Sequence, residues 1–99
     1  MAVNVVSKTA LERFARAHPP AAGPLQTWHT VVSHATWTCV PDVRKTYNTV
    51  DHIGGETLVF NVNSNRIIAN VAFNSEAKTW LYIQHVFTHS EYDAWNKAR

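Results

Sequence analysis

The sequence has few of the residues that mark secreted, membrane or nucleotide-binding proteins. Cys39 is its one cysteine, so no disulfide can form within the chain, which fits a reduced compartment. With three glycines it has no Gly-rich phosphate-binding loop. No apolar run approaches the roughly 20 residues of a membrane span, and residues 1–7 lack the layout of a signal peptide. We therefore expect a cytoplasmic protein that does not enter a membrane.

Charge is sparse as well. Charged residues make up 16% of the chain, below the roughly 25% that is usual for soluble proteins. The formal net charge is only +2 and the cations are spread along the chain, so any basic surface must be assembled by folding. A length of 99 residues with 45% apolar content predicts a single domain, residues 1–99, around one core.

Histidine, by contrast, occurs six times. His29 and His34 are five residues apart, and His85 and His89 are four apart. No cysteine pair and no His-Glu-x-x-His pattern accompanies them, so the spacing does not match a zinc site. We predict that the protein uses neither a metal nor another cofactor.

The first half of the chain has helical patterns. Thr9 and Glu12 have the spacing of a capping box before a helix that Pro19-Pro20 ends. Gly23-Pro24 begins a second helix, whose apolar stripe is Leu25, Trp28, Val32 and Ala35. A short helical turn is predicted after Pro41, with Arg44 and Lys45 pointing outward.

In the second half the period changes to two, which is typical of strands. Strands are predicted over 50–53, 57–62 and 66–73, with turns at Gly54-Gly55 and Asn63-Ser64, and a further turn at 74–78. Residues 80–87 are apolar on both predicted faces, as in a central strand covered on both sides. His85 would share a face with Leu81 and Ile83, either at the core edge or facing a cleft. The order predicts an α+β fold, with two N-terminal helices, an antiparallel sheet of three to five strands and a short C-terminal helix.

The start of the C-terminal helix gathers groups that can exchange protons. Thr88 and Glu91 have capping-box spacing, so a helix should begin there. His89, Tyr92 and Asp93 then stand at i, i+3 and i+4 on one helix face. A helix N-terminus favours an anion such as a phosphate, and these side chains suit acid–base chemistry. The alternative is structural: capping by Thr88 and Glu91, solvation by Asp93 and packing of Tyr92 on the sheet.

Polar residues around the second hairpin have two interpretations. Arg66 opens the return strand, and Asn61 and Asn65 flank the turn before it. They could be ordinary turn residues, or they could hold a phosphate or a base near the C-terminal helix.

Several motifs form a recognisable set: Val59-Phe60-Asn61-Val62 with Asn65, then Tyr82-Ile83, then Thr88-His89-x-Glu91-Tyr92-Asp93. Further motifs lie upstream, at residues 7–11, His18-Pro19, Pro24-Leu25-x-x-Trp28, Ala35-x-Trp37, Pro41-Asp42-Val43 and Tyr47. In all of these the chain resembles the HigB-type toxins of bacterial type II toxin–antitoxin systems, which are members of the RelE/ParE superfamily. The resemblance covers nearly the whole chain.

This resemblance implies a RelE-like fold, in which N-terminal helices pack on a twisted antiparallel sheet. It also implies an mRNA interferase, an endoribonuclease that cleaves mRNA on the ribosome without a metal. The implied partner is a helix-turn-helix antitoxin of the HigA type. Two alternatives within the superfamily are a non-nucleolytic, ParE-like toxin that binds DNA gyrase and an inactive protein that only binds an antitoxin.

The chemistry of such an enzyme assigns roles to the candidate residues. The 2′-hydroxyl of RNA attacks the neighbouring phosphate, with an acid, a base and a cation assisting. The catalytic candidates are His89 for proton transfer, Tyr92 as a second acid–base or stacking group, Asp93 to orient His89, and Arg66 for the phosphate. The candidates for RNA binding are Asn61, Asn65, Arg44, Lys45 and His85.

The chain departs from the family at two positions. Many relatives have an arginine where this chain has Ile68, and another where it has Gln84. Arg66 lies two residues from Ile68, on the same face of the predicted strand. It could therefore replace part of the missing charge.

Overall fold

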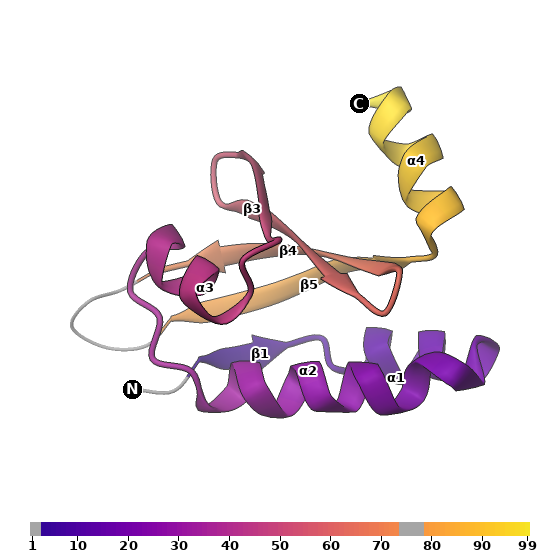
Figure 1. The fold of residues 1–99 in the computed structure, drawn as a ribbon, viewed down its shortest axis with the longest axis horizontal. Helices are drawn as coiled ribbons and strands as arrows, with labels where there is room; N and C mark the ends of the chain where they lie inside the picture. Colours follow the sequence, from indigo (N-terminus) through magenta and orange to yellow (C-terminus); the bar gives the residue numbers. More distant parts are fainter. Residues whose placement is uncertain (1–2, 74–78) are drawn as a thin grey trace.

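Helices and a single sheet make up the computed structural model, which describes residues 3–73 and 79–99. The strands form one five-stranded sheet in the order β1-β5-β4-β3-β2. The predicted α+β, RelE-like fold is confirmed (Figure 1). In chain order the elements are β1 (Asn4–Val6), α1 (Thr9–Ala17), the 3₁₀ helix η1 (Pro19–Ala21), α2 (Ala22–His34), α3 (Val40–Thr46), β2 (Asp51–Gly54), β3 (Thr57–Val62), β4 (Asn65–Ala72), β5 (Trp80–Phe87) and α4 (His89–Ala98).

The sheet is antiparallel from β2 to β5 and gains one parallel strand at its edge. Strand β1 runs parallel to β5, with Asn4 opposite Trp80 and Val6 opposite Tyr82. The short N-terminal segment is therefore an edge strand. The β3–β4 hairpin has the predicted two-residue turn, in which Asn63 and Ser64 have φ values of 50° and 69°. The turn predicted at 74–78 lies outside the described residues.

The first helix begins differently from the prediction. Its N-cap is Lys8, without a side-chain cap, and Thr9 is already inside the helix. The capping box predicted from Thr9 and Glu12 is therefore wrong. The backbone carbonyl of Ser7 instead accepts from the N–H of Ala10 at 3.0 Å, so a turn of the main chain starts the helix and a side-chain acceptor is not required.

The main core lies between one face of the sheet and the helices α1 and α2 (Figure 1). Leu25, Trp28 and Val32 of α2 are buried there, as the helical stripe predicted. The ring of Phe60 on β3 packs edge-on against Trp28, with centroids 5.2 Å apart. Such aromatic pairs add to the free energy gained by burying apolar area. We name this side of the sheet the helix-covered face.

Strand β5 is central in the sheet but is not covered on both sides. Leu81 and Ile83 are buried on the helix-covered face, whereas Trp80 and Tyr82 on the other side are 38% and 44% exposed. The prediction of a strand covered on both faces is therefore wrong. Apolar side chains on both sides of a central strand did not mean two packed layers, because the outward-facing ones here are aromatic and remain in contact with solvent.

A β-bulge in β5 moves His85 to the other face. Ala69 pairs with Ile83 but Ile68 pairs with His85, so Gln84 is the extra residue. One extra residue reverses the alternation of side chains, and Val86 rather than His85 packs against the main core. The prediction that His85 shares a face with Leu81 and Ile83 is therefore wrong. We name the side opposite α1 and α2 the open face; it carries Trp80, Tyr82, His85 and Phe87 of β5 and Arg66, Ile68 and Asn70 of β4.

Helix α4 follows β5 directly and begins with the predicted capping box. The Thr88 hydroxyl accepts from the backbone N–H of Glu91 at 3.2 Å, and the Glu91 carboxylate accepts from the N–H of Thr88 at 2.8 Å. The helix buries none of its residues. It rises on the opposite side of the sheet from α1 and α2 (Figure 1).

Replacing Thr88 with alanine should destabilise α4 by about 1 kcal/mol, because one backbone N–H loses its acceptor. Since α4 contributes nothing to the core, we expect faster amide hydrogen exchange within α4 and little change in the unfolding temperature of the whole protein. Thr9→Ala is the matched control, because Thr9 caps nothing. Equal effects of the two substitutions on their own helices would contradict the assignment.

Candidate nuclease site

Arg66 is the centre of a polar cluster where β3, β4 and α4 meet. Its Nη1 donates to the side-chain oxygen of Asn61 at 2.9 Å and to the carbonyl of Asn65 at 3.4 Å. Its Nη2 lies 3.3 Å from Nδ1 of His89. The β3–β4 hairpin brings Asn61 opposite Arg66 in the sheet register, which explains why the guanidinium is held in place.

His89 lies between a cation and an anion. Its Nε2 lies 3.5 Å from the Asp93 carboxylate. A guanidinium has only donors, so Nδ1 must accept from Arg66, and Nε2 must then carry the proton that faces Asp93. These partners assign the tautomer of His89 and aim its lone pair toward the Arg66 guanidinium.

Aromatic rings flank the cluster. The Arg66 guanidinium carbon lies 5.7 Å from the centroid of the Tyr92 ring, within cation–π range. Tyr92 contacts Trp95 at 6.0 Å between centroids, and Trp95 contacts His85 at 5.9 Å. These rings attach α4 to the open face of the sheet. We name the group Asn61, Asn65, Arg66, His89, Tyr92 and Asp93 the Arg66–His89 cluster.

The cluster is open to solvent. The side chains of His89 and Asp93 are 61% and 53% exposed, and the Tyr92 side chain is partly buried against its neighbours. A site without walls suits a large substrate that lies across the surface better than a small molecule, which needs an enclosing pocket.

The structure brings together most of the residues selected from the sequence, but not all of them. His85 lies outside the cluster and is connected to it through its contacts with Trp95 and Phe87. Arg44 and Lys45 are exposed on α3, away from α4 (Figure 1). On α3 the Nζ of Lys45 lies 3.9 Å from the Oδ1 of Asp42. Sequence reasoning missed Trp95, although its i+3 spacing from Tyr92 would place it beside that ring on the helix.

The capping box occupies part of the helix N-terminus. The carboxylate of Glu91 and the hydroxyl of Thr88 already take two of the backbone N–H groups there. A phosphate at this end would also face the negative charge of Glu91. The cation of the cluster, Arg66, is therefore the better anchor for an anion.

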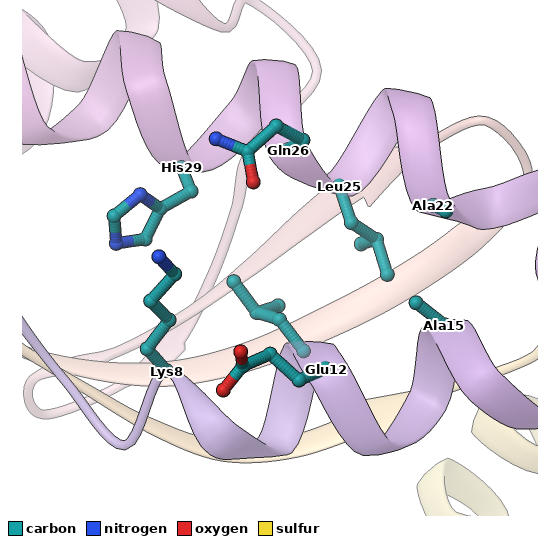
Figure 2. Close-up of a pocket in the computed structure, with 8 residues that line it drawn as sticks. Lys8, Glu12, Ala15, Ala22, Leu25, Gln26 and His29 are labelled. Carbon is teal, nitrogen blue, oxygen red and sulfur yellow. The ribbon is translucent and has the colours of Figure 1, made fainter.

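A hollow lies between α1 and α2, on the other side of the sheet from the Arg66–His89 cluster. Leu11 and Leu25 are its apolar lining residues. Figure 2 shows Lys8, the N-cap residue of α1, directed toward His29 of α2. Burial lowers the pKa of His29 below its ordinary value near 6.5, and the neighbouring Lys8 cation lowers it further. This hollow is separate from the Arg66–His89 cluster.

The lowered pKa of His29 predicts a pH-dependent stability. The unfolded chain takes up a proton at a higher pH than the folded protein, so stability falls as the pH drops below 6.5. We expect His29→Gln to reduce the difference in the free energy of unfolding between pH 7.5 and pH 5.5, measured by urea denaturation. Lys8→Met should reduce it partly, because burial of His29 remains. An unchanged pH dependence in His29→Gln would contradict this origin.

Two further observations concern metals and membranes. In residues 3–73 and 79–99, no group of three His, Cys, Asp or Glu side chains is close enough to hold a metal ion. None of the helices in this described part of the chain combines the length and the apolar character needed to cross a bilayer.

A comparison with protein-family models matches residues 21–95 to the HigB toxin family, described as the RelE-like toxic component of a toxin–antitoxin system. The chain belongs to this family. As a HigB-type toxin it is one half of a toxin–antitoxin pair, and an antitoxin is its partner. The matched segment includes every residue of the Arg66–His89 cluster. A comparison with curated protein sequences found no match.

Proposed function

We propose that this toxin is an mRNA interferase, a metal-independent endoribonuclease that cleaves mRNA through attack of the 2′-hydroxyl. The contact of Arg66 with His89 carries this proposal, because it puts a cation next to a group that can move a proton. Membership of the HigB family and the open, unwalled surface both support it. The products would be a 2′,3′-cyclic phosphate and a free 5′-hydroxyl.

His89 is suited to act as the base. When the Arg66 guanidinium turns to a phosphate oxygen, the lone pair on Nδ1 is released and can take the proton of the 2′-hydroxyl. Asp93 then faces the proton on Nε2 and stabilises the imidazolium that forms. Contacts of 3.3 and 3.5 Å are long, as is common in a catalytic site before its substrate binds.

Arg66 and Tyr92 complete the reaction. The 2′-oxygen bonds to phosphorus while the bond from phosphorus to the 5′-oxygen breaks, so negative charge grows on the phosphate oxygens. Arg66 would stabilise this charge with the N–H groups that Asn61 does not use. Tyr92, beside Arg66, could give its phenolic proton to the leaving 5′-oxygen. Each proton that leaves the 2′-hydroxyl is matched by one delivered to the product.

The partners follow from this proposal. The substrate would be mRNA, on the ribosome, in the cytoplasm, and the antitoxin would be a helix-turn-helix protein of the HigA type. A neighbouring reading frame that encodes such a protein would support this assignment. Arg44 and Lys45 would then contact RNA outside the cluster, since α3 lies away from α4.

The test is to induce the chain in bacteria and map new RNA 5′ ends, beside His89→Ala and Tyr92→Phe. We expect growth arrest with new mRNA ends in the wild type and loss of both in His89→Ala. Growth arrest without new ends would overturn the nuclease proposal. Gyrase-dependent DNA damage with intact mRNA would point to a ParE-like toxin, and no toxicity at all to a protein that only binds an antitoxin.

A further inference from the structure

The open face of β5 exposes a pair of large aromatic side chains that the Arg66–His89 cluster does not use. Trp80 and Tyr82 are among the most exposed large apolar residues of the described chain, at 38% and 44%. Their rings are close to parallel, with an interplanar angle of 15° and centroids 6.3 Å apart. Exposed rings that contact each other in this way are not needed to hold the core, which lies on the helix-covered face.

The pair is continuous with the cluster along one face. The next outward-facing residues of β5 are His85 and Phe87, whose rings also stack, with centroids 4.9 Å apart and planes 12° apart. Phe87 lies opposite Arg66 in the sheet register. A row of four rings therefore runs from Trp80 to the Arg66 guanidinium, about 20 Å long at the usual rise of a strand.

The surroundings of this row are polar and not acidic. Asn70 is the neighbour of Tyr82 on β4, and its amide oxygen accepts from the Thr57 hydroxyl at 2.8 Å. Asn4 and Ala72 flank Trp80 on either side. No acidic residue occupies the described open-face positions of β1, β5 and β4 between Trp80 and Arg66. A carboxylate, that of Asp93, is met only within the Arg66–His89 cluster, where it faces His89.

We propose that this row is a stacking platform for single-stranded RNA, on which bases lie against Trp80 and Tyr82 while the chain leads to the scissile phosphate at Arg66. The proposal rests on the proposed nuclease function and adds a path for the substrate. Aromatic side chains bind unpaired bases through their flat faces with little preference for sequence. The planes of the two rings differ by only 15°, so their exposed faces offer bases one common stacking direction.

The charge and the shape favour RNA over a second protein chain. A protein partner would gain most from a broad apolar patch. Here the rings of Trp80 and Tyr82 form a narrow row bordered by Asn4 on β1 and Asn70 on β4. The length of the row corresponds to about six stacked nucleotides at about 3.4 Å each. A duplex would not fit, because its bases are paired and their faces are covered.

The experiment measures RNA binding in a His89→Ala background, so that cleavage does not remove the ligand. The probe is an end-labelled single-stranded RNA of ten nucleotides, with the matching duplex as comparison. We expect Trp80→Ala and Tyr82→Ala each to raise the Kd about five- to hundredfold. Trp80→Phe and Tyr82→Phe keep an aromatic face and should retain most of the affinity. Val31→Ala is the matched control, because Val31 is an exposed apolar residue of α2.

Cleavage by the otherwise unchanged protein separates this inference from the proposed function. With the cluster intact, Trp80→Ala and Tyr82→Ala should raise KM and leave kcat near the wild-type value. If the wild type cleaves RNA and both alanine variants bind and cleave like it, the platform is overturned and the nuclease proposal stands. If the wild type binds RNA but does not cleave it, the nuclease proposal fails, while loss of binding in the alanine variants still supports the platform. If those variants keep RNA affinity and lose antitoxin affinity, the face serves the protein partner and the platform is overturned.

Discussion

His89→Ala is expected to lower the rate of RNA cleavage by about 100- to 10,000-fold, the usual contribution of a positioned acid or base. The substitution removes the group that faces both Arg66 and Asp93. The His89 side chain is exposed, so the variant should fold and unfold like the wild type. The measurement is single-turnover cleavage of a short labelled RNA, with the unfolding temperature recorded beside it.

Two variants sharpen this prediction. Asp93→Asn keeps the shape of the side chain but removes the charge that would stabilise the imidazolium, so a smaller loss of rate is expected. His34→Ala removes another exposed histidine, at the end of α2, and should leave cleavage unchanged. A wild-type rate in His89→Ala would exclude this residue as the base and leave Tyr92 as the candidate.

Arg66→Ala is expected to lower the cleavage rate by about 100- to 1,000-fold. This is the usual effect of removing one group that stabilises the charge of a transition state. Ile68 and Gln84 carry no charge, so neither supplies a second cation that could compensate for the loss of Arg66. Ile68 is also fully buried. The loss should appear in kcat as well as in kcat/KM, because the charge develops in the transition state.

The control for Arg66 is a charge change elsewhere. Arg44→Ala with Lys45→Ala removes two cations from α3 and should weaken RNA binding with a smaller effect on kcat. Arg66→Lys keeps the charge but loses the planar fork that Asn61 holds, so only partial activity is expected. If the α3 double variant lost kcat as severely as Arg66→Ala, the phosphate would have to be placed near α3 instead.

The fold was predictable where local chemistry decides it. Thr88 and Glu91 are of the right type and spacing for a capping box, and Asn63 tolerates the left-handed backbone of a two-residue turn, so both features follow from neighbouring residues. Thr9 and Glu12 have the same spacing but do not form a box, because the chain enters α1 through a main-chain turn. A pattern of residue types permits a cap but does not require it.

The residues of the Arg66–His89 cluster were predictable as a group, but their geometry was not. The i, i+3 and i+4 spacing placed His89, Tyr92 and Asp93 together, since a helix repeats every 3.6 residues. The contact between Arg66 and His89 depends instead on which strand lies next to the start of α4. The bulge at Gln84 depends on pairing between strands, which no periodicity within β5 reveals. For the same reason the open face, with its exposed rings, was not expected.

Helix α4 supplies half of the Arg66–His89 cluster, yet none of its side chains is buried. Segments held by few apolar contacts detach in local openings that cost far less than global unfolding. His89 therefore stays aligned with Arg66 only while Tyr92 and Trp95 remain packed against the sheet. A substitution that weakens this packing could silence the toxin while its melting curve stays the same, so thermal stability is a poor guide to whether the Arg66–His89 cluster is assembled.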